Sequence, residues 1–368
     1  MGAERLTVRV PGKLMVAGEY AVLEPHQPSV VVGVDRYMTA SIRLAPEHGL
    51  SVPAWGLLDV PFQDLHDRIR FRDRDPRLKF VSEAMAVALG YLREQFLLTL
   101  PFHLTIESEL ESEGRKIGLG SSAAVVVATV AAVLHLLGDD DVGPDAETIF
   151  KLSAIAHLRG QGSGSGADVA ASTYGGWIEY RSFQPEWLLE RLDRKPPLYR
   201  LLTEPWPFLA IEPFAPPPEL VLCVGWTGQP ASTSELIERV RALRDRDPVA
   251  YGTFLKESRE AVEAFVLAMR QGAGPQAIAE LEHNRRALAT LGAHSGAMIE
   301  TPALYELHRW AELLGGGGKP SGAGGGDCGV ALIAGRDRAE SLHAAWSKAG
   351  IAPLRLAVSE AGVEVTEG

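Results

Sequence analysis

Two glycines and two serines, Gly118, Gly120, Ser121 and Ser122, stand directly before a helix-forming run of Ala, Val and Leu that extends to Leu137. The backbone amides in the first turn of a helix have no partner within the helix, and the helix dipole adds positive charge there. Glycine also lets the backbone approach a ligand closely. The pattern therefore predicts a phosphate site, in which the serine hydroxyls either cap the helix or face a phosphate-bound cation.

A capped, buried helix would explain the same pattern without a ligand, because glycine-rich helix starts are common. Two further stretches rich in Gly and Ser change the balance, since they lie at 161–168 and 319–327 of the same chain. Three such loops predict one shared site. In the following we call 118–123, 161–168 and 319–327 the first, second and third glycine loops.

Two charged residues are the candidates for chemistry beside these loops. Lys13 follows Pro11-Gly12 and is the only cation among apolar neighbours, and Asp168 ends the second glycine loop. A surface lysine and a helix-capping aspartate are the ordinary alternatives, because lysine is mostly exposed and aspartate is a good N-cap. The residues alone leave both pairs of interpretations open.

The composition excludes several classes of protein. The chain has 368 residues, 46% of them hydrophobic and 23% charged, and a net charge of -11. This acidic balance argues against binding to nucleic acid or to acidic membranes. Cys223 and Cys328 are too few for a disulfide framework, and neither a leader nor a membrane-spanning apolar run is present, so we expect a cytoplasmic protein.

The order of predicted elements indicates a mixed α/β chain with two domains. Proline is dense between residues 191 and 218, which predicts a domain junction, and we place the domains at 1–195 and 196–368. Residues 59–79 carry mixed charge and predict a solvated connection. The other main predictions are strands at 6–10, 13–17, 29–34, 38–44, 102–106, 177–180, 220–224 and 330–334, and helices at 80–96, 146–157, 249–270, 275–291 and 338–349.

Neither of the common nucleotide motifs fits. A Walker A loop fails because Gly318-Lys319 is followed by Pro320 and because Leu313 stands where its first glycine is required. Gly118 to Ala123 does match the looser dinucleotide pattern G-x-G-x-x-G/A. That fingerprint must follow a buried strand, whereas residues 107–116 are polar, so we do not favour it.

Three segments together resemble the GHMP kinase superfamily: PGKLMVAGEY at 11–20, GLGSSA at 118–123 and GAGGGDC at 322–328. They occur in the order and at the separations of that superfamily. Within it the chain is most similar to the bacterial phosphomevalonate kinases, through AGEYAVLEP at 17–25, GWTGQPAST at 225–233, the third glycine loop, and parts of 284–302. The similarity extends over almost the whole chain.

The resemblance implies an α+β, two-domain GHMP kinase fold, with an N-terminal domain like ribosomal protein S5 domain 2 and a ferredoxin-like C-terminal domain. It implies ATP and Mg²⁺ as cofactors, phosphomevalonate as the small-molecule substrate and diphosphomevalonate as the product, made by a monomer or homodimer. The alternatives are another kinase of the superfamily such as mevalonate kinase, a related decarboxylase, or a sensor that binds ATP without catalysis.

The resemblance also implies roles for individual residues. Lys13 and Asp168 are the implied catalytic pair, and Ser122, with Ser121 as second choice, is the implied magnesium contact. The implied nucleotide-binding residues are Lys116, Gly118, Leu119, Gly120, Ser121, Ser122 and Ala123. The implied acceptor-binding residues are Lys13, Tyr20, Ser163, Ser165, Lys319, Ser321, Ala323 and Gly324. One position departs from mevalonate kinases: His157 stands where they carry a magnesium-binding glutamate, and we therefore leave it outside the predicted site.

Overall fold

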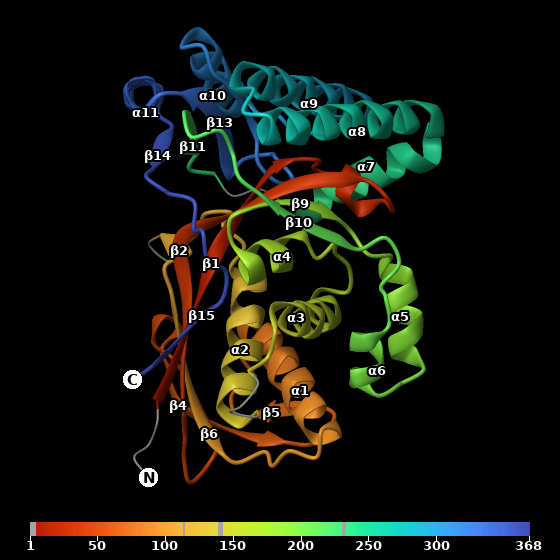
Figure 1. Ribbon diagram of the computed structural model, residues 1–368, viewed down its shortest axis with the longest axis vertical. Helices are drawn as coiled ribbons and strands as arrows, with labels where there is room; N and C mark the ends of the chain where they lie inside the picture. The colour runs from red at the N-terminus through yellow and green to blue at the C-terminus, as the bar shows by residue number, and fades with distance from the viewer. Residues whose placement is uncertain (1–4, 113–114, 139–142, 230–232) are drawn as a thin grey trace.

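The computed structural model describes residues 5–112, 115–138, 143–229 and 233–368. Figure 1 shows two parts: a large sheet with helices packed on one side, and above it a smaller sheet covered by long helices. The described helices and strands agree with the predicted mixed α/β class. None of the helices in these ranges is long and apolar enough to cross a membrane.

The large sheet is organised around two long antiparallel strands, β1 (Arg5–Ala17) and β2 (Pro28–Leu44). Its order is β10-β9-β2-β6-β3-β4-β5, with β1 on β2 and β15 on β1. The remaining strands are β3 (Gly49–Val52), β4 (Leu57–Asp64), β5 (Ile69–Phe71), β6 (Phe102–Ser108), β9 (Trp177–Arg181), β10 (Ala210–Phe214) and β15 (Glu364–Glu367). A separate hairpin of β7 (Glu111–Ser112) and β8 (Arg115–Lys116) precedes the first glycine loop.

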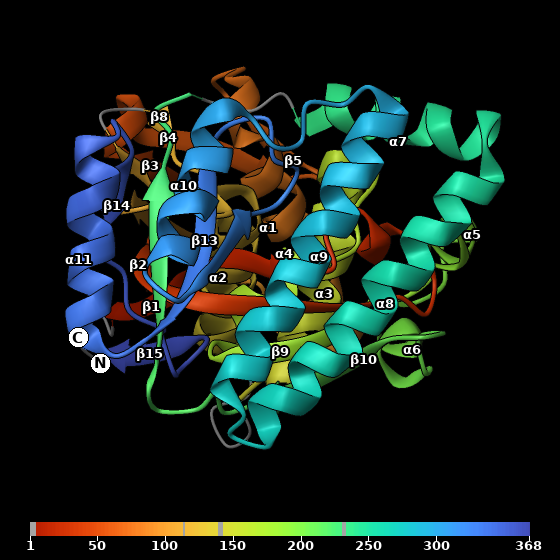
Figure 2. The ribbon, with the colours of Figure 1, turned by 90° about the horizontal axis from the view of Figure 1, so that it is seen from above.

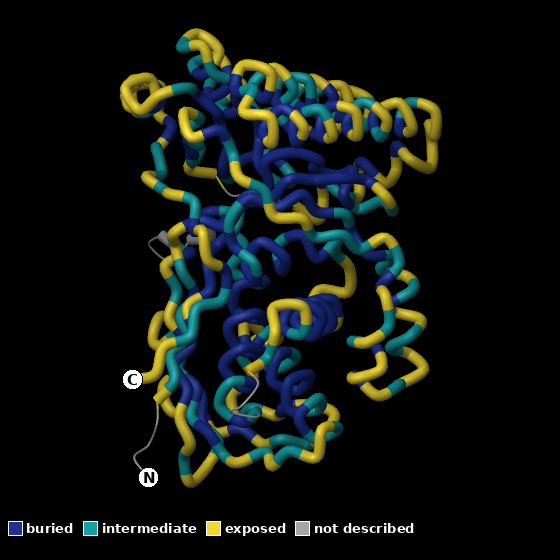
Figure 3. The backbone as a smooth tube through the Cα atoms, viewed as in Figure 1, coloured by how far each residue is buried: buried dark blue, intermediate teal, exposed yellow. Residues whose placement is uncertain are grey.

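Four helices cover one face of this sheet: α1 (Lys79–Glu94), α2 (Ser121–Leu137), α3 (Ala146–Gln161) and α4 (Ala167–Tyr174). Helix α2 is apolar on all sides because it packs on β1, β2 and three of the other helices. Its burial is visible in Figure 3, where the inner turns of the helices and strands are dark blue. The start of α2, which carries the first glycine loop, is therefore held rigidly. Two short helices, α5 (Pro185–Asp193) and α6 (Leu198–Thr203), follow β9.

The smaller sheet is antiparallel, in the order β12-β13-β11-β14. Its strands are β11 (Leu220–Trp226), β12 (Gly317–Pro320), β13 (Cys328–Ala334) and β14 (Ala352–Leu354). The helices of this part are α7 (Thr233–Arg246), α8 (Pro248–Arg270), α9 (Gly274–Ser295), α10 (Pro302–Leu313) and α11 (Arg336–Lys348). Figure 2 shows α8 and α9 lying side by side across the top. The third glycine loop joins β12 to β13.

Two strands join the large sheet although they lie beyond residue 195. Strand β10 pairs with β9, and the last strand β15 pairs with β1. The predicted domain boundary between residues 195 and 196 stays a prediction. By strand pairing, β10 and β15 belong to the large sheet, although both follow residue 195.

The prediction of a solvated connection over 59–79 holds only in part, because much of the segment is exposed. Strand β4 and the short strand β5 lie within it and extend the large sheet, with Val60, Phe62 and Ile69 buried in the core. The charged side chains between these positions lie on the solvent side. Their frequency conceals the alternation that is typical of an edge strand.

Candidate active site at three glycine loops

The first glycine loop presents the open end of α2. Gly118 and Gly120 have φ values of 79° and 78°, in the left-handed region that favours glycine. Gly120 is the N-cap, no side chain caps the helix, and no acidic residue lies in its first turn. The first-turn amides and the positive end of the helix dipole are therefore left without a capping side chain. Ser121 and Ser122 are half-buried beside them.

Lys13 lies along this loop. Its backbone N–H donates to the Leu119 carbonyl at 2.9 Å, and its Nζ lies 3.5 Å from the Gly118 carbonyl oxygen. The side chain passes so close to Gly120 that a Cβ there would lie 2.7 Å from Lys13 Cγ. Lys13 is therefore a half-buried cation at the first glycine loop. Glycine at position 120 makes room for it.

The second glycine loop connects α3 to α4 and places Asp168 in the first turn of α4. Asp168 Oδ1 accepts a hydrogen bond from the Val169 N–H at 3.0 Å, and its side chain is 27% exposed. Tyr180 Oη and Ser182 Oγ donate to the Ser165 carbonyl at 2.6 and 3.0 Å, which fixes this end of the loop. Ser163 is exposed.

His157, which sequence reasoning left out, connects the first two loops. Its Nε2 lies 3.4 Å from Ser122 Oγ and 3.8 Å from Asp168 Oδ2. The imidazole is only 3% exposed, so it is an internal group of the site rather than a surface residue. Its position in the last turns of α3, directly before the second glycine loop, was the one signal available from the sequence.

The third glycine loop closes the opposite side. Ser321 Oγ donates to the Met15 carbonyl at 2.8 Å, and Tyr20 Oη donates to the Ala323 carbonyl at 2.6 Å. A Cβ on Gly118 would lie 3.3 Å from Asp327 Cβ, so the first and third loops touch directly. Burial, with a smaller effect from Glu19, raises the pKa of Tyr20, so its hydroxyl stays protonated as a donor.

Lys319 was predicted as a phosphate contact, but its ammonium has protein acceptors. It is completely buried, forms an ion pair with Glu19, and donates to the Pro320 carbonyl at 2.8 Å. Burial lowers the pKa of Lys319, and the neighbouring Glu19 carboxylate opposes this effect. In this conformation the Lys319 ammonium joins the third loop to Glu19, just after β1, and its predicted contact with phosphate stays a prediction.

The remaining predicted residues lie at the first and third glycine loops or just before the first. Ala123 is buried in the first turn of α2, Leu119 is buried, and Gly324 has a φ of 71° beneath the Ile299 carbonyl. Lys116 belongs to β8, but its side chain lies outside the described residues, as do Pro230, Ala231 and Ser232.

The donor set suits magnesium held mostly by ligand oxygens. Ser122 Oγ and the Asp168 carboxylate both lie near His157 Nε2, and the Asp327 carboxylate lies beside Gly118. Within the described ranges, no group of three His, Cys, Asp or Glu side chains is arranged to hold a metal ion. Mg²⁺ commonly keeps several waters and binds through substrate phosphates plus one or two protein oxygens, so the set fits a magnesium–nucleotide complex.

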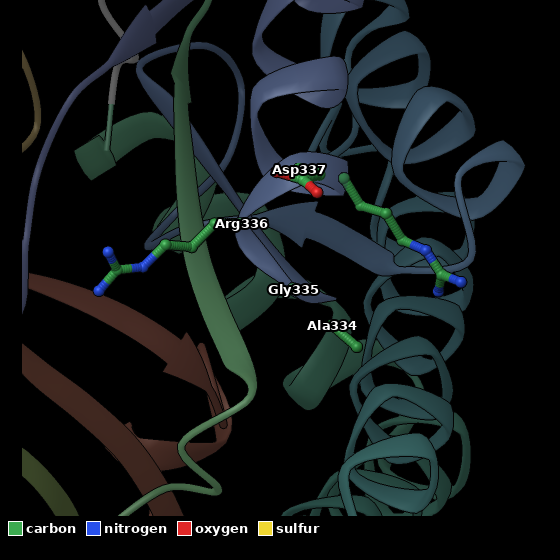
Figure 4. A pocket seen from close by; sticks show the side chains of 5 residues that line it. Ala334, Gly335, Arg336 and Asp337 are labelled. Atoms are coloured by element: carbon green, nitrogen blue, oxygen red, sulfur yellow. The ribbon is translucent and has the colours of Figure 1, made fainter.

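A surface hollow elsewhere has no relation to these loops. It lies at the turn between β13 and α11 and is lined by Ala334, Gly335, Arg336, Asp337 and Arg338. Figure 4 shows Arg336 extending away from Asp337 there. None of the glycine-loop residues lines it.

Comparison with known proteins agrees with this site. Residues 80–176 match the model of the GHMP kinases N-terminal domain, and residues 276–352 match that of the GHMP kinases C-terminal domain. The phosphomevalonate kinase of Streptomyces sp. (strain CL190) is 35% identical, over 98% of this chain and 99% of that protein. The chain belongs to the GHMP kinase superfamily.

Two solved structures show the same fold over nearly the whole chain. A crystal structure of the Lin0012 protein from Listeria innocua has a TM-score of 0.92 at 36% identity, covering 99% of this chain and 100% of that one. The Streptococcus pneumoniae phosphomevalonate kinase, solved with phosphomevalonate and AMPPNP, has a TM-score of 0.83 at 29% identity, covering 96% and 99%. The predicted two-domain α/β kinase fold is confirmed.

Proposed function

We propose that this protein is an ATP-dependent phosphomevalonate kinase, which makes diphosphomevalonate in the mevalonate route to isoprenoids. In this reaction the bond between the γ-phosphorus of ATP and its bridging oxygen breaks. A bond forms from that phosphorus to a phosphate oxygen of the acceptor, and ADP leaves. The convergence of three glycine loops with Lys13 and Asp168 carries the kinase part of the proposal, and similarity to named phosphomevalonate kinases supports the acceptor.

Phosphoryl transfer needs positioning and charge stabilisation more than covalent help. The open amides of the first glycine loop suit the ATP phosphates, and the Ser122 hydroxyl suits the magnesium ion that they carry. Lys13, with its ammonium beside Gly118, would neutralise charge on the transferring group. Magnesium, when bound, supplies further neutralisation of the phosphate oxygens.

Asp168 has an unusual task under this proposal. A phosphate acceptor is already largely ionised near neutral pH, so a general base has little proton to remove. We therefore assign Asp168 to orienting the acceptor and the cations around it. Ser163, Ser165 and the third glycine loop remain our candidates for contacts to the acceptor, and we place the activity in the cytoplasm.

The test is an ADP-release assay with phosphomevalonate, mevalonate, galactose and homoserine in parallel. We expect turnover with phosphomevalonate and at most weak turnover with the others. Turnover with mevalonate but none with its phosphate would reject the acceptor and favour a mevalonate kinase. The replacement of a carboxylate by His157 already argues against that alternative, because mevalonate kinases use a glutamate at this position.

A further inference from the structure

His157 is held in one orientation by an aromatic stack. Its ring lies nearly parallel to that of Phe80 from α1, with the centroids 5.2 Å apart and an interplanar angle of 19°. Gly160, one turn further along α3, makes this stack possible, because a Cβ there would lie 2.8 Å from Phe80 Cδ1. Burial on all sides leaves the imidazole little freedom to turn. Its Nε2 edge therefore has a fixed direction.

That edge faces two side chains from two different helices. Ser122 Oγ, from the start of α2, lies 3.4 Å from Nε2, and Asp168 Oδ2, from the start of α4, lies 3.8 Å from it. A ring N–H at Nε2 would donate to the serine oxygen and lie beside the carboxylate. The negative charge of Asp168 favours the tautomer that carries its proton at Nε2. A lone pair of the Ser122 oxygen then stays available for a cation.

We propose that His157 is a positioning residue that keeps the Ser122 hydroxyl and the Asp168 carboxylate in register for phosphoryl transfer. The inference rests on the proposed function, in which Ser122 serves the magnesium–nucleotide complex and Asp168 serves the acceptor. Small displacements of such groups have large effects on rate, and partners behind a metal ligand commonly change activity when they are replaced. His157 itself touches no reactant.

Three substitutions separate positioning from packing and from metal ligation. His157→Gln keeps an N–H donor of similar reach, and we expect kcat to stay within about fivefold of wild type. His157→Leu keeps volume but no donor, and we expect kcat to fall about 10- to 100-fold. In that variant the KM for ATP should change less than about threefold. His157→Glu puts a second negative charge beside Asp168 and should lose at least as much activity as the leucine variant.

His135→Leu is the matched control, because His135 is a half-buried histidine near the opposite end of α2. It should keep wild-type kcat. Two results would overturn the proposal. A wild-type kcat in His157→Leu would mean that the ring serves packing alone. A kcat in His157→Glu equal to or above that of wild type would mean that this is a metal-ligating position that prefers a carboxylate.

A spectroscopic measurement needs neither a folded His157 variant nor the correct acceptor. In protein labelled with ¹⁵N-histidine, Asp168→Asn should shift the Nε2 resonance of His157 and leave that of His135 unchanged. An unchanged His157 resonance overturns the positioning role. If the wild-type protein phosphorylates none of the four acceptors, the proposed function fails, while the spectroscopic result still decides whether His157 Nε2 interacts with the Asp168 carboxylate.

Discussion

The first glycine loop and the segment around β1 contact the other two loops in different ways. The contacts with the third loop differ in length and burial from those with the second loop. Toward the third loop the contacts are short and buried, and we call this set the domain contact. It consists of the Glu19–Lys319 ion pair and of hydrogen bonds from Tyr20 to Ala323 at 2.6 Å, from Ser321 to Met15 at 2.8 Å and from Cys328 to Ile117 at 3.0 Å. The residues whose side chains make these contacts, Glu19, Tyr20, Lys319, Ser321 and Cys328, are at most 8% exposed.

Toward the second loop, α4 packs on β1 and α2, but the polar side-chain contacts described there are made by one atom, Nε2 of His157. Both of its distances exceed those of a strong hydrogen bond, and Asp168 is partly exposed. Catalytic hydrogen bonds are often long in a free enzyme and tighten when the reactants bind. This difference indicates that the domain contact holds the site together without ligands. The groups on the side of the second loop would make short contacts only when ligands are bound. Changes to the former should lower stability, and changes to the latter should lower rate.

The largest effect is expected in the domain contact. Lys319→Met would leave the buried Glu19 carboxylate without its partner, and its Oε2 already lacks a hydrogen bond. Breaking a buried pair from one side typically costs about 3–5 kcal/mol, which urea unfolding will measure. The double variant Glu19→Gln with Lys319→Met removes both charges and should regain much of this loss. A single variant that unfolds at the wild-type urea concentration would contradict the assignment.

For the two proposed catalytic residues, Lys13→Met and Asp168→Asn should each lower kcat at least about a hundredfold, because the proposed function has both groups act on charge in the transition state. Their urea unfolding curves should stay close to wild type. Lys256→Met on the exposed face of α8 is the control for loss of a lysine. Near-normal turnover of Lys13→Met would remove its proposed role, and a large loss of stability would erase the distinction between the two sides.

Two glycines of the third loop sharpen the comparison. Gly322 and Gly324 have nearly equal φ values of 72° and 71°, so alanine meets the same backbone strain at both, about 1–2 kcal/mol. A Cβ at 322 meets nothing within 4 Å, whereas at 324 it would lie 2.2 Å from the Ile299 carbonyl oxygen. Gly324→Ala should therefore unfold at lower urea than Gly322→Ala. Equal urea midpoints of the two variants would mean that the backbone around residue 324 shifts to accommodate the added Cβ.

Local signals made much of this fold predictable. Asp145 caps α3, Thr301 caps α10 and glycine precedes α2, and each of these signals depends on residues within one turn. The strands predicted at 6–10 and 13–17 form one continuous strand, β1, with only a register shift between Pro11 and Gly12. Long-range pairing with β2 outweighs the local turn signal there.

Two residues owe their surroundings to distant parts of the chain. Lys319 is implied as an acceptor contact by the family resemblance, but its ion-pair partner Glu19 lies 300 positions away. His157 was left outside the predicted site because it stands where mevalonate kinases carry a glutamate, and its contacts depend on where α2 and α4 begin in space. No periodicity or spacing within a single sequence encodes such meetings, so contacts of this kind could not be predicted from the sequence.

The smallest effect concerns the two thiols. Burial raises the pKa of both Cys328 and Cys223 to about 12, so each stays protonated in the folded protein. Because the folded pKa is raised, their contribution to stability is fully present below the ordinary value of 9.0 and is lost as pH rises toward about 12. At pH 8 iodoacetamide should label neither thiol in native protein and both in urea, as read by mass spectrometry. Cys328 belongs to the domain contact, whereas Cys223 lies in the core of the smaller sheet.

Lys319→Met should therefore expose Cys328 to labelling before Cys223. Equal labelling of the two thiols in that variant would show that the domain contact does not open by itself.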